Sequence, residues 1–370
     1  MTTSTKINTY KYKDALTPFL RVFILRNGGR SFATSANFVR RKEQTKLYSE
    51  TASEGVTMKH IFIINPVAGN GKLQETLEKT IHLELKDRKI DYEVYITKSE
   101  ADTRNFTELK CKENVQAVLY ACGGDGTLHE VINAACSYKH VSIGVIPVGS
   151  GNDFIKNFKN NINFNDINLQ TEGENIELDL IKVNNEYAAT VLNIGLDADV
   201  AFNMNKFKKI PFIQGPTRYY LSILYSLFNK LGKQIIVETE NGVINGSFLI
   251  GVVANGQYYG SGYKCAPKAM LNDGILDLCF VENISRLKIL SLIASYKKGE
   301  HLENPKISKY VTYDKIKQAK IKFDEPTNVC MDGDKFIYNE VNISAEKNAL
   351  NFWLPKGVQL QSQSFGDNYS

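Results

Sequence analysis

The sequence has no run of about 18 uncharged apolar residues, the length that a helix needs to cross a bilayer. Its longest apolar runs, such as residues 61–64 and 248–254, have the length of strands. It also has no Cys-x-x-Cys pair and only five histidines, which argues against a zinc site. We expect its six cysteines to be reduced and mostly buried, because most stand beside aliphatic or small residues. These absences predict a globular chain that does not span a membrane.

Net positive charge is confined to the first 57 residues. The chain has a formal net charge of +5, whereas residues 1–57 hold ten Lys or Arg against four acids, which is +6. The remainder is close to neutral at −1, so no nucleic-acid footprint is indicated. The basic extension is open to three interpretations: an organelle presequence, a membrane-surface arm, or a disordered tail upstream of a true start at Met58. We favour the disordered tail.

With 370 residues, of which 43% are hydrophobic, the chain is long enough for two domains. In residues 58–158 strand and helix patterns alternate, which predicts a parallel sheet with helices on its faces. Loops at the carboxyl ends of such strands hold ligands. The expected strands are 61–64, 92–96, 117–120 and 143–146, and the expected helices are 73–86, 101–109 and 126–136.

After residue 158 the pattern changes to short alternating strands with Asn and Gly turns, which predicts a β-rich second domain over 159–344. A strand near 345–358 is expected to return to the first domain, and 359–370 form a polar tail. The expected strands of the second domain are 176–182, 187–195, 234–240, 247–254 and 275–281, with one helix at 217–231.

Three glycine-bearing loops follow strands of the first domain. The loop over 65–72 has small residues that let backbone amides approach an anion, although it lacks the GxxxxGK[ST] form of a P-loop. The loop Gly123-Gly124-Asp125-Gly126-Thr127 combines a close backbone turn with a carboxylate for Mg²⁺ and a hydroxyl near phosphates. A tight turn with Asp125 as a helix cap is the alternative. The loop over 147–154 adds a second carboxylate, Asp153, near the same metal, or else an ordinary capping loop.

In this order and spacing, the NPxxG, GGDGT and Gly-Ser-Gly-Asn-Asp loops resemble the diacylglycerol kinase catalytic-domain family, which includes soluble bacterial diacylglycerol kinases and the sphingosine and ceramide kinases. The resemblance continues through residues 193–197, 263–269 and 271–277 and covers about residues 58–356. It implies an α/β first domain with the parallel sheet of NAD kinases and diacylglycerol kinases, followed by a β-sandwich second domain.

The same resemblance implies ATP and Mg²⁺ as cofactors and assigns site residues by position. Catalytic roles fall on Asp125, Asp153 and Asp334. A structural magnesium would be held by the Asp273 carboxylate and by the backbone carbonyls of Met270 and Ile275. The alternative interpretation of this segment is a plain Asp-Gly turn without a metal. Nucleotide contacts are implied at Asn65, Pro66, Val67, Ala68, Gly69, Thr97, Gly124, Asp125, Gly126, Thr127, Leu128, His129, Glu130 and Ser150.

One residue departs from the family pattern. The family's general base is the Glu of an Asp-Gly-Glu motif, whereas this chain has Asp332-Gly333-Asp334. The missing methylene withdraws the carboxylate by roughly 1.3 to 1.5 Å. We still assign the base to Asp334, because the reaction needs only an aligned alcohol that is partly deprotonated.

The resulting hypothesis is an ATP-dependent lipid kinase that phosphorylates diacylglycerol or a similar membrane lipid. Such a protein would be cytoplasmic and peripherally bound to the bilayer, and the residues 206–220 interleave lysines and aromatics in a way that suits this contact. A buried amphipathic helix is the alternative there. The bacterial relatives also suggest a homodimer. Two rival functions stay open: an NAD kinase, and a non-catalytic regulator that has lost its base.

Overall fold

The computed structural model describes residues 58–71, 74–207, 216–229 and 231–361. These residues belong to one compact unit over 57–370. The basic extension, most of the polar tail and residues 208–215 of the predicted membrane-contact stretch lie outside them. Among the described helices, none combines the length and the apolar character that crossing a bilayer requires.

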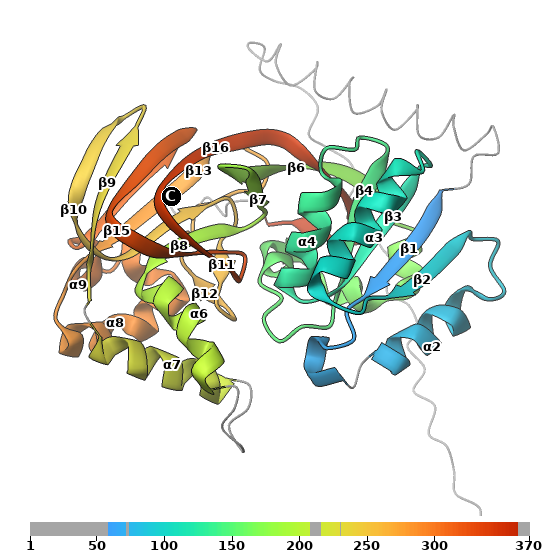
Figure 1. Ribbon diagram of the computed structural model, residues 1–370, viewed down its shortest axis with the longest axis horizontal. Coiled ribbons are helices and arrows are strands. Elements are labelled where there is room, and N and C mark those ends of the chain that lie inside the picture. Colours follow the sequence, from blue (N-terminus) through green and yellow to red (C-terminus); the bar gives the residue numbers. More distant parts are fainter. Residues whose placement is uncertain (1–57, 72–73, 208–215, 230, 362–370) are drawn as a thin grey trace, which may run out of the picture. The chain divides into compact units, whose positions relative to one another are not determined.

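The first half of this unit contains the parallel sheet that the sequence predicts (Figure 1). Strand β1 lies between β2 and β3, β3 also pairs with β4, and these pairings are parallel. All seven residues of both β3 and β4 are buried, since helices cover both faces of the sheet. The strands are β1 (Lys59–Ile64), β2 (Tyr92–Ile96), β3 (Ala117–Gly123) and β4 (Val141–Pro147), and the helices are α2 (Gln74–Leu85), α3 (Glu100–Lys112) and α4 (Asp125–Ala135).

Two apolar clusters explain why the sheet needs both layers of helices. Helices α3 and α4 pack on one face through Phe106, Leu128 and Ile132. Helix α2 and the short α5 (Ile167–Thr171) pack on the other face through Ile81, Leu85 and Ile167. Between β4 and α5 lie η3 (Phe154–Asn157), β5 (Phe158–Lys159) and η4 (Asn161–Asn165). The first residues of the predicted polar tail form β17 (Gln359–Leu360), which pairs with β5.

The second half is rich in β-structure, and two of its strands bend. Strands β10 and β15 each contain a register shift, and both pair with β8 along one part and with β9 along another. One apolar core lies among these strands and includes Leu192, Val237 and Ile321. The strands are β6 (Glu174–Val183), β7 (Glu186–Ala188), β8 (Val191–Gly195), β9 (Lys233–Thr239), β10 (Gly242–Ala254), β11 (Tyr258–Tyr259), β12 (Tyr263–Lys264), β13 (Leu276–Glu282), β14 (Val311–Ile316), β15 (Gln318–Met331) and β16 (Asp334–Leu354).

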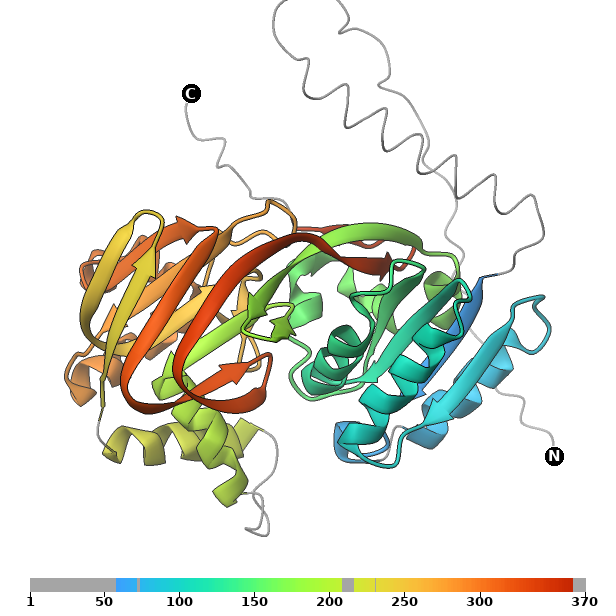
Figure 2. The same cartoon turned by 45° about the horizontal axis from the view of Figure 1, so that its top comes forward.

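Strand β16 joins the two halves. It begins beside β15, continues along β6, and ends where Phe352 pairs in parallel with Ile143 of β4. Figure 2 shows this long curved strand running from the β-rich half to the parallel sheet. The residue that opens β16, Asp334, is therefore fixed by a strand that both halves share.

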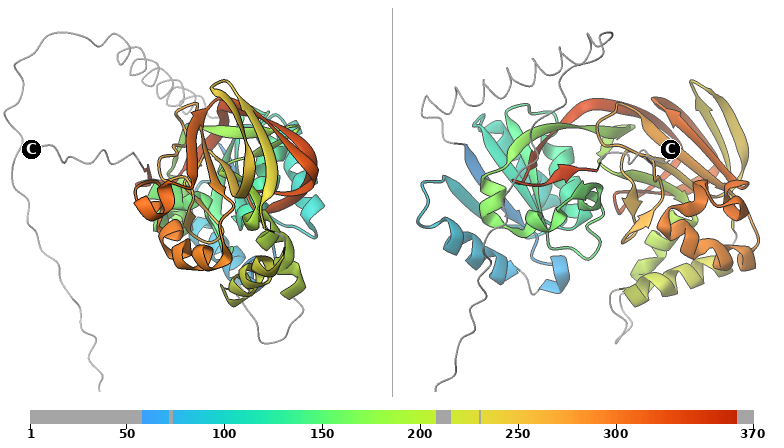
Figure 3. Two further views of the ribbon diagram at one scale, coloured as in Figure 1. Left: turned by 90° about the vertical axis from the view of Figure 1, so that its left-hand side faces the viewer. Right: turned by 180° about the vertical axis from the view of Figure 1, so that it is seen from behind.

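Helices lie along one side of the β-rich half, as both views in Figure 3 show. They are α6 (Leu196–Phe207), α7 (Pro216–Phe228), α8 (Arg286–Lys298), η5 (Glu300–Leu302) and α9 (Pro305–Ser308). The sequence prediction included only α7, so α6 and α8 were missed. The predicted strand over 187–195 is in fact two strands, β7 and β8, separated by Ala189 and Thr190. All six cysteines are free thiols and five are buried, as expected.

Candidate functional site

Three loops meet at the carboxyl ends of neighbouring parallel strands. Because β1, β3 and β4 are adjacent, the loops that follow them lie side by side. The backbone N–H of Asn65 donates to Cys122 O at 3.0 Å, and that of Gly149 donates to Gly123 O at 3.1 Å. A Cβ on Gly149 would stand 2.4 Å from Gly124 Cα, so glycine is required where the second and third loops touch. The sequence motifs thus form one site at the end of the sheet, where α/β proteins bind ligands.

The first loop is tied to the second by one side chain. Asn65 Nδ2 donates to Thr127 Oγ1 at 3.0 Å, and Asn65 Oδ1 accepts from Val67 N at 3.1 Å. The loop then turns through Ala68 and Gly69, where η2 (Ala68–Gly71) begins. Thr97 at the end of β2 is buried, and its N–H donates to Ile64 O just before this loop. Pro66 lies between Asn65 and Val67, which are joined by the hydrogen bond from Val67 N to Asn65 Oδ1.

The start of helix α4 has no side-chain cap. Its N-cap residue is Gly124, which has no side chain to cap the first N–H groups. Such exposed N–H groups and the positive end of the helix dipole favour a phosphate. Gly126 and the buried Thr127 follow in the first turn, whereas Leu128 packs into the core on the α3 and α4 side. Leu128 therefore anchors the helix in the core, whereas Gly126 and Thr127 lie in the turn next to the loop.

Asp125 lies beside this helix start, with a second carboxyl group, Asp153, nearby. Its Oδ1 accepts from Asp153 N at 2.8 Å and from Phe154 N at 3.3 Å, which holds the third loop against the second. Burial, and then the nearby Asp153 carboxylate, raise the pKa of Asp125 to about 7. A divalent cation bound here would relieve this repulsion, and a carboxylate oxygen is a ligand that Mg²⁺ prefers. Asp125 therefore fits the predicted metal role.

Asp153 is engaged by protein groups on both oxygens. Its Oδ1 lies 2.5 Å from Lys156 Nζ, and its Oδ2 accepts from Ser261 N at 2.8 Å. The Lys156 ammonium also donates to Gly151 O at 2.9 Å. Asp153 thus connects the third loop to the turn between β11 and β12 in the β-rich half. The sequence analysis did not predict a role for Lys156 or Ser261. Ser150, a predicted nucleotide contact in the same loop, is exposed to solvent.

The turn before β16 is fixed by a buried carboxylate. Asp332 accepts hydrogen bonds from the backbone N–H groups of Ala189, Thr190 and Val191, at 2.5, 3.0 and 2.9 Å. Burial raises the pKa of Asp332 to about 6 even with these three donors. Both Asp332 and Gly333 have positive φ, at 48° and 99°. The turn that presents Asp334 is therefore set by contacts with the segment between β7 and β8.

Replacing Asp332 by alanine is expected to lower the free energy of unfolding by about 3 kcal/mol, because three N–H donors would lose their acceptor and relief of the buried charge offsets only part of this. Urea unfolding of the two proteins measures the difference. Asp332→Asn keeps one acceptor oxygen and should lose about half as much. An alanine variant within about 0.5 kcal/mol of the parent would contradict the anchoring role.

This turn brings Asp334 to helix α4. Asp334 Oδ1 is 3.7 Å from the position that a Cβ on Gly126 would take, and Asp334 Oδ2 is 3.6 Å from His129 Nε2. Glu130 belongs to the same group, since one ligand atom from each of these three side chains lies within 4.8 Å of the others. The structure therefore brings the predicted base of the second half to the GGDGT helix of the first.

Arg104 organises the far side of this group. Its Nε lies 2.8 Å from Glu130 Oε2, and its Nη2 lies 3.0 Å from Glu186 Oε2. The hydrogen bond to Glu186, together with the charges of both glutamates, raises the pKa of Arg104. The sequence reasoning did not single out Arg104 or Glu186, because Arg104 lies on α3 and its partners on α4 and β7. Arg104 links α3 and α4 to the β-rich half beside the site.

Asp273 takes part in a local turn. Its Oδ1 accepts from Ile275 N at 3.1 Å, and its Oδ2 lies 3.5 Å from Lys315 Nζ. The same ammonium is 3.6 Å from Asp277 Oδ2, and Gly274 has a φ of 78°. These contacts are those of the Asp-Gly turn that the sequence left as the alternative. A magnesium ion held there with the carbonyls of Met270 and Ile275 stays a prediction.

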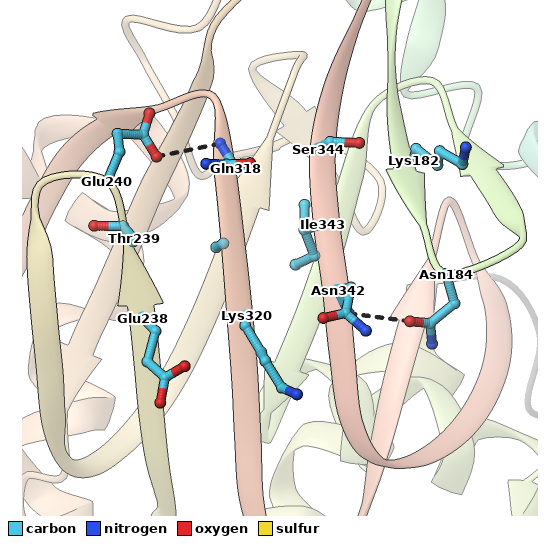
Figure 4. A pocket seen from close by; sticks show the side chains of 11 residues that line it. Lys182, Asn184, Glu238, Thr239, Glu240, Gln318, Lys320, Asn342, Ile343 and Ser344 are labelled. Atoms are coloured by element: carbon cyan, nitrogen blue, oxygen red, sulfur yellow. Dashed lines mark hydrogen bonds between the residues drawn. The ribbon is translucent and has the colours of Figure 1, made fainter.

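A separate hollow of about 500 Å³ lies on the β-rich half. It is lined by polar and charged residues of both signs on β6, β9, β15 and β16, among them Lys182, Glu238 and Lys320 (Figure 4). None of its lining residues comes from the three loops or from the turn at Asp334. The hollow therefore contributes nothing to the candidate site.

Residues 59–183 match the family model of the diacylglycerol kinase catalytic domain, and residues 190–352 match that of the YegS C-terminal NAD kinase beta sandwich-like domain. The diacylglycerol kinase of Staphylococcus carnosus (strain TM300) is 25% identical over 300 residues, which is 80% of this chain and 95% of the relative. That of Staphylococcus aureus (strain MRSA252) is 28% identical over 277 residues, which is 74% and 84% of the two chains.

Solved structures give the same picture of the fold. A putative diacylglycerol kinase from Bacillus anthracis strain Sterne superposes with a TM-score of 0.65 at 22% identity, over 80% of this chain and 97% of the other. A second structure described in the same way, from the same strain, gives a TM-score of 0.63 at 23% identity, over 80% and 96%. At these identities the likeness establishes the architecture of both halves.

Proposed function

Since the chain belongs to the diacylglycerol kinase catalytic-domain family, and is thus a kinase, we propose that it transfers the γ-phosphoryl group of ATP to a hydroxyl of diacylglycerol or a similar membrane lipid. The observation that carries this proposal is the approach of Asp334, from the β-rich half, to within 3.6 Å of His129 on the GGDGT helix. A base in that position serves a second substrate that enters beside the nucleotide phosphates.

The residues of the site have distinct parts in the proposed reaction. The N–H groups at the start of α4 and the Thr127 hydroxyl stabilise charge on the phosphates. Asp125 would hold Mg²⁺, which would supply positive charge at the phosphate oxygens. Asp334 aligns the lipid hydroxyl and receives its proton. No covalent enzyme intermediate is needed, because positioning accounts for most of the acceleration in phosphoryl transfer.

One assay separates this function from its rivals. The full chain is incubated with labelled ATP, Mg²⁺ and mixed micelles of diacylglycerol, sphingosine, phosphatidylglycerol or undecaprenol, with NAD in a parallel tube. Label in a lipid supports the proposal, and its distribution identifies the acceptor. Label in NAD alone overturns the proposal in favour of a nucleotide kinase. Binding of ATP without transfer to any acceptor supports the regulator.

A lipid substrate requires contact with a bilayer, and we propose that helices α7 and α8 provide it in a cytoplasmic, peripherally bound protein. Both helices expose large apolar side chains: Phe228 is 78% exposed and Leu287 is 82% exposed. The helices adjoin there, since Arg286 Nε donates to Leu227 O at 2.6 Å. Leu224, Tyr225 and Leu290 are exposed on the same two helices.

The charge on this surface suits an anionic membrane. Helix α8 carries four basic residues and no acid. On the α7 side, Lys206 Nζ stands 4.5 Å from the centre of the Tyr225 ring, an arrangement that keeps an ammonium at the level of an interfacial aromatic. Apolar side chains with flanking Lys and Arg are typical of helices that lie in the headgroup region.

Exchanging both Phe228 and Leu287 for serine is expected to weaken binding to vesicles of phosphatidylglycerol and diacylglycerol at least tenfold, because two of the most exposed apolar anchors are lost. Co-sedimentation measures the binding. Activity toward a short-chain, water-soluble diacylglycerol should stay within about twofold, since the phosphate site is untouched. Leu83→Ser, at a 63% exposed position on α2, is the matched control and should bind vesicles like the parent. Equal binding by all three proteins would contradict this surface.

A further inference from the structure

His129 is a buried histidine whose ring has no hydrogen-bond partner among the described residues. It lies on α4, four residues after Asp125, and only 1% of its surface is exposed. Neither Nδ1 nor Nε2 makes a hydrogen bond. Burying an imidazole without hydrogen-bond partners is unfavourable, so a buried unpaired ring of this kind calls for an explanation, such as a role in catalysis.

Burial also fixes the charge state of this ring. It lowers the pKa of His129 to about 4, and the effects of Glu186 and Arg104 oppose each other. At neutral pH the ring is uncharged, with one nitrogen that donates and one that accepts. Its 3.6 Å approach to Asp334 is therefore a contact between a neutral ring and a carboxyl group, and not an ion pair.

The contact with Asp334 is slightly too long for a hydrogen bond. Hydrogen bonds from N–H to O span about 2.7 to 3.2 Å, so a movement of roughly half an ångström would complete this one. Catalytic hydrogen bonds are often long before the substrates bind and shorten in the reacting complex. The ring of Phe336, two residues after Asp334, lies with its centre 6.3 Å from that of His129. Packing against Phe336 keeps the imidazole beside the start of β16.

We propose that His129 is a positioning residue for phosphoryl transfer: its Nε2–H donates to Asp334 and directs the short carboxylate toward the acceptor hydroxyl. This inference rests on the proposed kinase function. In the step that Asp334 assists, the hydroxyl oxygen forms a bond to the γ-phosphorus as the bond from phosphorus to the β,γ-bridging oxygen breaks. The electron pair leaves with ADP, and the hydroxyl proton passes to Asp334. His129 keeps its own proton throughout.

The shorter side chain at position 334 gives such a partner a role. The carboxylate of an aspartate reaches less far than that of a glutamate, so a hydrogen bond from a neighbouring donor helps to orient it toward the acceptor hydroxyl. Of the three side chains in this cluster, His129 is the one with an N–H group to donate, and Glu130 is paired with Arg104 at 2.8 Å. That pairing, together with the preference of Mg²⁺ for oxygen ligands, also argues against a magnesium site made from these three side chains.

The test is a double-mutant cycle in the full chain. His129→Phe keeps an aromatic ring of similar size against Phe336 but has no donor, and it should lower kcat about 10- to 100-fold with the KM for ATP within twofold. His129→Gln retains an N–H donor at similar reach and should stay within about threefold of the parent. In the Asp334→Ala background, His129→Phe should cause no further loss, because a positioning residue acts through its partner.

Three outcomes overturn the inference: a His129→Phe enzyme as fast as the parent, a His129→Gln enzyme as slow as His129→Phe, or losses that multiply in the double variant. The unfolding midpoint and Mg·ATP affinity of each variant identify a damaged fold. The cycle is run on whichever acceptor the parent phosphorylates, so transfer to NAD alone refutes the proposed lipid acceptor and leaves the cycle informative. A parent that phosphorylates nothing overturns both.

Discussion

Asp125→Asn is expected to lower the rate of phosphoryl transfer about a thousandfold or more while leaving the protein folded. The amide keeps an oxygen that can accept from the N–H groups of Asp153 and Phe154, so the second and third loops stay joined. It loses the negative charge that would attract the cation. Losses of this size follow when a single group that stabilises transition-state charge is removed. Transfer of label from ATP to the lipid measures the rate.

The same substitution should raise stability at alkaline pH. The pKa of Asp125 is about 7 in the folded protein and is ordinarily 3.8, so the folded state holds a proton that the unfolded chain has already released between these values. As pH rises from about 4 to 7, the wild-type protein loses stability that Asp125→Asn keeps. The unfolding midpoint of the variant should thus exceed that of the parent at pH 8 and approach it near pH 4.

Asp324→Asn is the matched control, because it makes the same chemical change on an exposed carboxylate. It should match the parent in rate and in the pH dependence of its midpoint. A fully active Asp125→Asn enzyme would contradict the proposed role of Asp125 as a metal ligand. A variant that is inactive but unfolded at every pH would instead make the carboxylate a structural group.

The parallel sheet was predictable because its signals are local. Four apolar strands, each followed by a glycine-bearing loop or a helical pattern, give the order of elements and the end of the sheet at which the loops gather. Helix α8 also had local signals that the prediction overlooked. Ser285 stands at its N-cap, and Gly299, with a φ of 80°, stands at its C-cap. Helix α6 begins with Asp197 and Asp199 in its first turn, which is a similar signal.

The contacts that complete the site were not predictable, since they join segments far apart in the sequence. Asp332 accepts from Ala189, which precedes it by 143 residues. Asp153 accepts from Ser261, which follows it by 108 residues. The division of the predicted strand over 187–195 has the same origin, because the residues at the break donate to Asp332 instead of to a neighbouring strand. The motifs predict the residues of the proposed phosphate site, whereas the partners that hold these residues become visible only in the fold.

Asp334→Ala is expected to lower kcat about 10²- to 10⁴-fold, the range for loss of a general base, with the KM for ATP little changed. The physical reason is that Asp334 is the carboxylate that the β-rich half brings to α4, and it lies outside the three phosphate loops. Initial rates at saturating ATP and varied lipid separate kcat from KM. Glu340→Ala, at an exposed position on the same strand, is the control and should leave both constants unchanged.

Asp334→Glu restores the residue that the family pattern leads one to expect. The added methylene extends the carboxylate by about 1.5 Å. Glycine at position 126 leaves space beside it, since even a Cβ there would lie at an ordinary contact distance of 3.7 Å from Asp334 Oδ1. The glutamate variant should therefore equal or exceed the parent in kcat. An inert glutamate variant together with an unaffected alanine variant would show that the base lies elsewhere, whereas a weak glutamate variant beside an inactive alanine one would mean that this site has adapted to the shorter side chain.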